Sequence, residues 1–332
     1  MLHVLPAFSA DTLRIDCDAE ADKIVAGLRS QLRNMRKRGL VLGLSGGIDS
    51  SVSLALAVKA VGKDNVAAVF MPERDSDPDS LRLGQLVAGT FGVEGVIEDI
   101  GPTLDALGCY ARRDAAIRTI LPAYGEGWAC KVVIGQSDGG KGYNISSLVV
   151  RSPEGEMSTH RMPVEVYLAV VASTNMKQRT RKQLEYYHAD RLNFAVIGTP
   201  NRLEYDQGFF VKNGDGAADV KPIAHLYKTQ VYQLAAALGV PAEICARPPT
   251  TDTYSLPQSQ EEFYFALPYD RMDLCLYGLN NGIGAEAVAE AAGLTAEQVD
   301  YVWRDIASKR KATKYLHAGP QLIEPVSEIG SV

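Results

Sequence analysis

The chain has 332 residues, of which 46% are hydrophobic and 22% are charged, and its formal net charge is −6. This size and composition indicate a soluble globular protein with a substantial core, and the negative charge argues against a nucleic-acid partner, which requires a cationic surface. We expect no secretory leader and no membrane span, because no apolar run approaches the roughly 18 residues that a span needs, and we therefore expect a cytoplasmic protein.

The first third of the chain predicts alternating strands and helices. An amphipathic helix is expected over residues 20–38, where Gly39 would end it after a cluster of basic residues. The following elements are expected in this order: strand 40–44, helix 50–61, strand 66–71, helix 79–91 and strand 93–100. This alternation predicts an α/β fold, a doubly wound parallel sheet with helices on both faces.

Residues 105–165 interrupt this rhythm. Two β-rich runs, 130–134 and 145–150, enclose a glycine-rich turn and predict a helix followed by an inserted β-rich segment. The α/β pattern then resumes with a long helix over about 175–190, a buried strand over 193–198 and a helix ending at Gly239. The final region, 281–332, reads as a C-terminal helical segment. We expect one domain over residues 1–332 with the 105–165 insertion inside it.

The break between the first strand and its helix is the clearest functional signal. Residues 45–51 read Ser-Gly-Gly-Ile-Asp-Ser-Ser and follow a buried strand, so they lie at the carboxyl edge of the sheet, where open α/β folds bind ligands. Two glycines, several hydroxyls and a helix N-terminus suit a phosphate. A glycine turn with serine caps would explain the same residues without any ligand. The lysine of the nucleoside-triphosphate loop GxxxxGK[ST] is absent.

This loop resembles the pyrophosphate loop of the ATP-pyrophosphatase group of adenylating enzymes. Three later stretches resemble the NAD synthetase family: NMKQRTRKQLEYYH (175–188), the run 196–231 around GTPNRLEYDQGFFVKNGDGAAD, and RPPTTDTYSLPQSQEE (247–262). The resemblance covers about residues 20–100 and 170–315. It implies an adenine nucleotide α-hydrolase-like fold and an ATP-dependent amide ligase. Such an enzyme adenylates the carboxylate of nicotinic acid adenine dinucleotide, releases pyrophosphate, and lets ammonia displace AMP to give NAD.

The resemblance also assigns roles to individual residues. For ATP it implies Ser45, Gly46, Gly47, Ile48, Asp49, Ser50, Ser51, Arg181, Thr199, Lys228 and Thr250. For the dinucleotide it implies Tyr186, Lys212, Asp215, Asp219, Lys309 and Arg310. Asp49 and Glu204 would hold Mg²⁺, since two carboxylates plus phosphate oxygens suit this ion. Asp49, Lys212 and Lys228 would be the catalytic residues, with the lysines neutralising charge as the α–β phosphate bond breaks.

Several alternatives stay open from the sequence. The 105–165 segment could reshape the acid pocket, so the same chemistry could act on a different small carboxylic acid. A tRNA-thiolating relative shares the loop but would need reactive cysteine pairs, and the five cysteines include no CxxC pair. A non-catalytic nucleotide-binding regulator would not need both Asp49 and Glu204.

The expected partners are small molecules. The resemblance implies free ammonia or a separate glutaminase subunit as the nitrogen source, because no nitrilase-like region is recognised, and it implies a homodimer.

Overall fold

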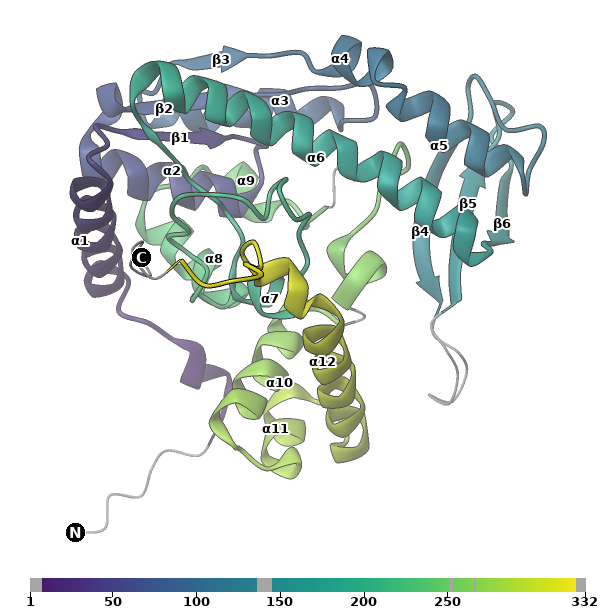
Figure 1. Cartoon of the computed structure of the whole chain (residues 1–332). Coiled ribbons are helices and arrows are strands. Elements are labelled where there is room, and N and C mark those ends of the chain that lie inside the picture. The colour runs from purple at the N-terminus through teal and green to yellow at the C-terminus, as the bar shows by residue number, and fades with distance from the viewer. Residues whose placement is uncertain (1–7, 136–144, 251–252, 266, 327–332) are drawn as a thin grey trace.

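The computed structural model describes residues 8–135, 145–250, 253–265 and 267–326 (Figure 1). Its central sheet has four strands in the order β3-β2-β1-β7, and every neighbouring pair is parallel. The strands are β1 Leu40–Gly43, β2 Val66–Phe70, β3 Gly95–Ile97 and β7 Ala195–Val196. The predicted parallel sheet is therefore confirmed.

Helices cover both faces of this sheet, as predicted. Side chains alternate along β1, so Leu40 and Leu42 pack on one face while Val41 packs on the other. The first face is covered by α1 Cys17–Met35, α2 Ile48–Val61, α3 Pro78–Thr90 and α8 Lys228–Ala237. The opposite face is covered by α4 Gly101–Ala106, α5 Cys109–Arg118 and α6 Val164–Leu192. Leu40, Val41 and Leu42 are all fully buried between these two layers, which explains why β1 reads as an uninterrupted hydrophobic run.

A second sheet forms where the β-rich segment was expected. It is antiparallel, in the order β4-β5-β6, with β4 Ala129–Gly135, β5 Ile145–Arg151 and β6 Met157–Arg161. Leu148 and Val150 are fully buried against Val166 and Val170 of α6. The predicted glycine-rich turn between β4 and β5 lies outside the described residues.

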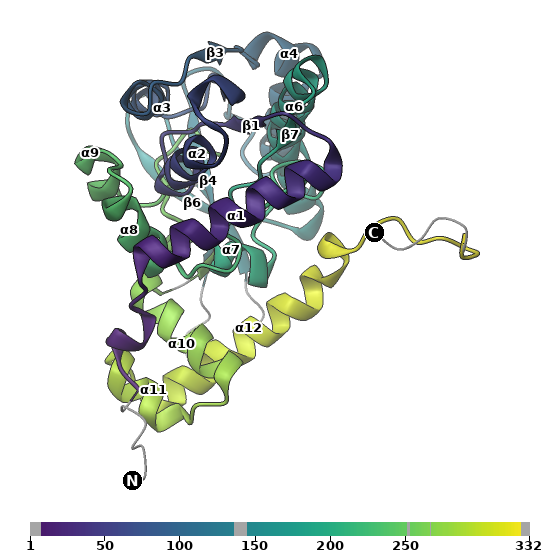
Figure 2. The ribbon, with the colours of Figure 1, turned by 90° about the vertical axis from the view of Figure 1, so that its left-hand side faces the viewer.

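The C-terminal helices form a separate layer (Figure 2). They are α10 Tyr269–Asn281, α11 Ala285–Ala292 and α12 Ala296–His317, and they enclose an apolar cluster that also takes in Leu13 and Leu203. The helical region therefore starts earlier than the predicted residue 281, and the described chain after His317 contains no further helix. The remaining short helices are η1 Ala10–Leu13, η2 Lys63–Asn65, α7 Arg202–Gln207, α9 Ala242–Ala246 and η3 Glu261–Phe265.

Some predicted boundaries were wrong. The first helix ends at Met35 because Arg36 adopts a left-handed conformation (φ 55°), so Gly39 does not terminate it. Gly39 instead permits close packing, since a Cβ there would lie 2.3 Å from the Asn65 carbonyl oxygen. The long helix begins at Val164 rather than at 175, because its first turns pack against the second sheet.

Two later elements were also predicted too long. The strand expected over 193–198 is Ala195–Val196 with one further parallel bridge at Ile197, and the helix ending near Gly239 covers Lys228–Ala237. None of the described helices combines the length and apolar character needed to cross a membrane.

Candidate active site

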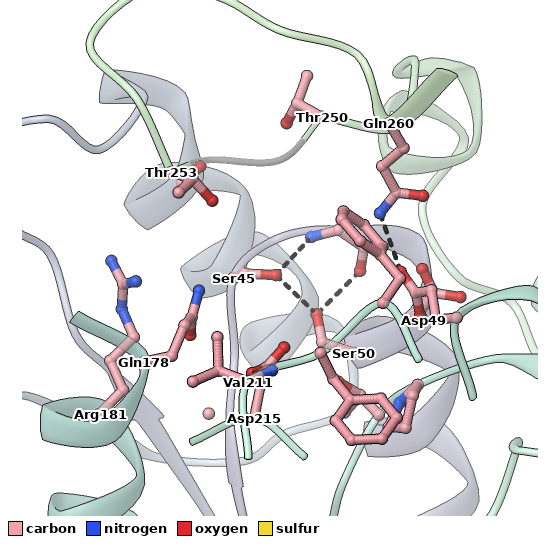
Figure 3. Close-up of a pocket in the computed structure, with 18 of the residues that line it drawn as sticks. Ser45, Asp49, Ser50, Gln178, Arg181, Val211, Asp215, Thr250, Thr253 and Gln260 are labelled. Carbon is pink, nitrogen blue, oxygen red and sulfur yellow. Dashed lines mark hydrogen bonds between the residues drawn. The ribbon is translucent and has the colours of Figure 1, made fainter. Parts of the chain in front are cut away.

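A large pocket opens at the carboxyl ends of β1, β2 and β7. Its volume is about 830 Å³, and we call it the edge pocket (Figure 3). It is lined by many of the residues that sequence analysis selected: Ser45, Gly47, Ile48, Asp49, Ser50, Arg181, Thr199, Glu204, Lys212, Asp215, Lys228 and Thr250. Side chains from positions 45 to 250 therefore meet around one cavity, as the strand–loop–helix pattern predicts.

The 45–51 loop forms one wall of this pocket through an internal hydrogen-bond network. Gly47 is the N-cap of α2, and its carbonyl accepts hydrogen bonds from the hydroxyls of Ser50 (2.9 Å) and Ser51 (2.8 Å). Ser45 Oγ accepts from the Gly47 N–H at 3.3 Å and lies 3.3 Å from Ser50 Oγ. Ser51 is fully buried and does not line the pocket, so its assignment to ATP stays a prediction.

Gly46 belongs to the 45–51 loop but faces α3 and does not line the pocket. Its φ is +74°, and a Cβ there would come within 2.7 Å of Leu83 Cβ and 2.9 Å of the Gly84 nitrogen. Only glycine combines this backbone conformation with such close packing against α3. Gly46 therefore fixes the loop against a helix, and its direct contact with ATP stays a prediction.

Two carboxylates and a lysine come together beside the loop. Lys228 Nζ donates a hydrogen bond to Asp49 Oδ2, and its side chain is only 2% exposed. Gln260 Nε2 donates to Glu204 Oε1 at 2.9 Å, the bond drawn as a dashed line from Gln260 in Figure 3. Burial, together with the nearby negative charge of Asp49, raises the pKa of Glu204 to about 8. Asp49 and Glu204 are therefore close enough to repel each other.

This arrangement is suited to a magnesium ion whose remaining ligands come from a nucleotide. A cation between two carboxylates that repel each other would remove the repulsion, and hard oxygen ligands are those that Mg²⁺ prefers. Over the described ranges, no group of three or more His, Cys, Asp or Glu side chains could hold a metal ion by itself. A metal here would thus depend on phosphate oxygens and water for its other ligands.

Asn201 connects the two carboxylates, and sequence analysis missed it. Its Nδ2 donates to Asp49 Oδ1 at 3.0 Å, and its backbone N–H donates to Glu204 Oε2 at 3.0 Å. Its own Oδ1 caps α7 by accepting from the Leu203 and Glu204 N–H groups. The signal was present, because Asn followed three residues later by Glu is a capping-box pattern.

Asp273 is a second missed residue, and it supports Lys228 from α10. Its carboxylate accepts the backbone N–H groups of Lys228 (3.2 Å) and Thr229 (2.7 Å) and so caps α8. Burial raises the pKa of Asp273 to about 7. Nothing local to the sequence joins position 273 to position 228, so this contact could not be predicted.

The opposite side of the pocket holds charged residues of α6. Arg181 Nε donates to the Met71 carbonyl at 3.3 Å, at the end of β2. Lys182 and Glu185 form an ion pair at 2.6 Å, and both are nearly fully buried. Burial raises the pKa values of Glu185 and Asp215. Sequence analysis missed Lys182 and Glu185, since charged residues on a helix are usually solvated.

Four of the residues selected for the dinucleotide do not line the edge pocket. The Tyr186 hydroxyl donates to Asp219 Oδ1 at 3.3 Å, and Asp219 Oδ2 accepts the Val196 N–H at 2.7 Å. Lys309 pairs with Asp305 at 2.6 Å. Their roles toward a substrate stay predictions.

Arg310 is the fourth of these residues. It forms a two-pronged pair with Asp206 (2.6 and 2.8 Å), which joins α12 to α7. Lys212 does line the pocket, but its Nζ donates to the carbonyls of Tyr315 and Ala318, each at 2.7 Å. Lys212 therefore holds the end of α12 in this conformation.

Sequence comparisons identify a family. The family model described as NAD synthase matches residues 20–119 and 140–315. An NH(3)-dependent NAD(+) synthetase of Rhizobium meliloti is 75% identical over 322 residues, covering 97% of this chain and 96% of that protein. The Rhizobium rhizogenes protein of the same name is 66% identical and covers 98% of each chain. That of Thermotoga maritima is 36% identical over 78% of this chain and 86% of its own length.

Solved structures share the fold at low sequence identity. The NH3-dependent NAD synthetase of Campylobacter jejuni, in complex with the nitrate ion, has a TM-score of 0.62 and 20% identity, covering 94% of this chain and all (100%) of that chain. The NMN synthetase of Francisella tularensis has a TM-score of 0.61 and 22% identity, with the same coverage of 94% and 100%. These likenesses support the parallel sheet flanked by helices.

Proposed function

The chain belongs to the NAD synthetase family, in its ammonia-dependent type, and we propose that it uses ATP to amidate nicotinic acid adenine dinucleotide to NAD. The observation that carries this proposal is the meeting of the 45–51 loop with Asp49, Glu204 and Lys228 in one pocket, within a chain so similar to enzymes of that name. The comparisons give no support to the alternative acid substrate, to tRNA thiolation or to a non-catalytic regulator.

In this proposal the loop binds the departing pyrophosphate of ATP. The N-terminus of α2 supplies unpaired N–H groups and the positive end of a helix dipole, and Ser45 supplies a hydroxyl at the pocket wall. Asp49 and Glu204 hold Mg²⁺, which when bound offsets the negative charge of the phosphates. Ile48, Thr199, Thr250 and Arg181 contact the rest of ATP.

Lys228 acts on charge that develops during the reaction. Its ammonium is buried beside Asp49, at the N-terminus of α8, where water does not screen it. As the bond between the α-phosphorus and its bridging oxygen breaks, negative charge grows on the pyrophosphate, and a fixed cation stabilises it. Lys212 adds a second cation once a ligand replaces its carbonyl partners.

The chemistry needs no side-chain nucleophile. An oxygen of the nicotinate carboxylate attacks the α-phosphorus, and pyrophosphate leaves with the bonding electron pair. Ammonia then attacks the carboxyl carbon of this acyl-adenylate, AMP departs, and the nitrogen loses a proton to give the amide. The residues serve by positioning and electrostatics, consistent with a pocket that offers charge and hydrogen bonds.

The dinucleotide is assigned to the side of the pocket that carries Asp215. Asp215 lines the cavity, whereas Tyr186, Asp219, Lys309 and Arg310 do not line it and would act after a rearrangement or by positioning their neighbours. We also propose a homodimer, because the family resemblance implies one; light scattering on the purified protein measures its mass in solution.

The substrate assignment is tested by supplying ATP, Mg²⁺ and ammonia with each of two acids. Nicotinic acid adenine dinucleotide should give NAD, while nicotinic acid mononucleotide, which lacks the adenylate half, should react far more slowly. Faster turnover of the mononucleotide, or no turnover of either acid, would refute the proposal. Glutamine in place of ammonia should give no product.

A further inference from the structure

Lys177 is a buried cation that the proposed reaction does not use. It lies on α6, its side chain is 2% exposed, and it is not among the residues that line the edge pocket. Its Nζ donates to Glu73 Oε1 (2.9 Å), Asp75 Oδ2 (2.8 Å) and the Thr253 carbonyl (3.0 Å). All three protons of the ammonium are thus used, and burying such a group without function is costly.

The three acceptors belong to two segments that both line the edge pocket. Glu73 and Asp75 belong to the 72–78 segment that follows β2, whereas Thr253 belongs with the described residues 247–250 and 253–254 that precede η3. These segments are far apart in sequence, and Lys177 is bonded to both. A side chain that does not line the pocket therefore links these two walls, which the Arg247–Asp77 pair (2.7 Å) also joins directly.

Glu73 and Asp75 are also hydrogen-bonded to residues of α5. The Tyr110 hydroxyl donates to Glu73 Oε2 at 2.8 Å, and Arg113 donates to Asp75 Oδ2 at 2.6 Å, both from α5. Although burial alone would raise it, the pKa of Asp75 is lowered by Lys177 and Arg113. Asp75 is thus a charged anchor for Lys177.

The 72–78 segment is also connected to the 45–51 loop through α3. It leads into α3, whose first turns pack on Gly46, where a Cβ would lie 2.9 Å from the Ser80 carbonyl oxygen and 2.7 Å from Leu83 Cβ. Packing this close transmits small displacements. A shift of the segment held by Lys177 would therefore move the loop that we assign to pyrophosphate.

We propose that Lys177 is a positioning residue for ATP, holding the 72–78 segment and residues 253–254 at the spacing that the nucleotide requires. This inference rests on the proposed function for its ligand, ATP. It assigns Lys177 no contact with substrate. Its effect belongs to nucleotide binding, since the groups that we assign to the chemical step, Asp49 and Lys228, are not bonded to it.

The test separates positioning from simple stability. Lys177→Met leaves Glu73 and Asp75 with less compensating charge and is expected to lower the melting temperature. The double variant Lys177→Met/Glu73→Gln removes one carboxylate and should recover part of that loss, while the hydrogen bond from residue 177 to the Thr253 carbonyl stays absent. The double variant is compared with the Glu73→Gln single variant. Arg82→Ala is the control, because it breaks an exposed ion pair with Glu243 that joins α3 to α9 at the surface.

Calorimetry measures the Kd of ATP with Mg²⁺, and NAD formation gives kcat and KM. We expect Lys177→Met to raise the Kd and KM for ATP by about tenfold, with kcat at saturating ATP changed less than about twofold. The double variant should keep this tenfold rise despite its higher melting temperature, and Arg82→Ala should match wild type.

A Kd that recovers together with the melting temperature would overturn the proposal, as would an unchanged Kd or a fall confined to kcat. A double variant without a cooperative melting transition would show that Lys177 serves folding, and would overturn it as well. If wild-type protein binds ATP but makes no NAD, the proposed function fails, while the binding comparison still decides the role of Lys177.

Discussion

The carboxylate of Asp49 has two observed partners and one neighbour of like charge. It accepts hydrogen bonds from Lys228 and Asn201, and its charge contributes to the raised pKa of Glu204. Because the Asp49 side chain is partly exposed at the edge of the sheet, we expect its replacement to affect chemistry more than folding.

The first prediction concerns Asp49→Asn. We expect the rate of AMP release to fall at least about 100-fold, because a neutral amide is a poor ligand for Mg²⁺ and no longer pairs with Lys228. The variant should still unfold cooperatively in urea, at a lower midpoint because the buried ammonium of Lys228 loses its charged partner. Asp64→Asn, an exposed carboxylate in η2, is the matched control and should retain full activity. Normal AMP release by Asp49→Asn would show that the metal is held elsewhere.

The second prediction follows from the pKa of Glu204. With a value of about 8 in the free protein, most Glu204 is protonated at pH 7.2 and most is ionised at pH 9.0. Only the ionised form is a metal ligand, so the affinity for ATP with Mg²⁺ should rise about sevenfold between these two pH values. Calorimetry in two buffers also reveals proton release on binding at pH 7.2.

Glu204→Gln should bind weakly at both pH values and lose this dependence. An affinity that is flat with pH in the wild-type protein, or that falls toward pH 9.0, would contradict the placement of Glu204 at the metal.

Single residues could be predicted when the sequence around them indicated their position in the fold. Asp49 and Glu204 each follow a buried strand, which places them at the same edge of the sheet, and the structure brings them together. Lys177, Lys182 and Glu185 were not predictable, because a helix surface in sequence looks the same whether water or a buried partner satisfies its charges.

At the scale of elements, the contact between the 45–51 loop and α3 leaves no room for a side chain at Gly46. Gly46→Ala places a methyl group within 2.7 Å of Leu83 Cβ at a φ of +74°. We expect it to lower the free energy of unfolding by about 2 kcal/mol or more and to weaken ATP binding, because the loop must move away from the helix.

Gly27→Ala supplies the matched control. Gly27 is exposed within α1 and a Cβ there meets nothing within 4 Å, so alanine should raise the free energy of unfolding by about 0.5–1 kcal/mol. Urea unfolding of both variants makes the comparison. A neutral Gly46→Ala would mean that the loop is not fixed by this contact.

The length of α6 shows where local sequence signals fail. Its first turns read Val-Glu-Val-Tyr-Leu-Ala-Val-Val, a β-branched run that favours strand by propensity. In the structure Val166 and Val170 pack against the second sheet, and this tertiary burial outweighs the local preference. The capping box at Asn201 shows the reverse: the Asn201 and Glu204 pattern predicts the start of α7 from sequence alone, yet the sequence analysis did not include Asn201.

At the scale of the whole molecule, the alternation of strands and helices was sufficient to predict a parallel sheet covered on both faces. The order of its strands was not, because β7 pairs with β1 only after more than a hundred intervening residues have folded elsewhere. The single-domain organisation and the status of 105–165 as an insertion stay predictions.

The packing of the second sheet on α6 rules out a deletion as a test of the role of that sheet. Deleting about 135–160 would remove Leu148 and Val150, which are fully buried, and would expose the face of α6 that they cover. Such a deletion is expected to unfold this part of the protein. Its effect on substrate affinity would therefore not be interpretable.

The central claim is that the 45–51 loop binds the two outer phosphates of ATP while they leave as one group. The most direct measurement is a phosphorus NMR analysis of the products formed from ATP, Mg²⁺, ammonia and nicotinic acid adenine dinucleotide. We predict AMP, pyrophosphate and NAD in equal amounts. ADP with orthophosphate would contradict the account, because the terminal phosphate alone would then be the group that leaves.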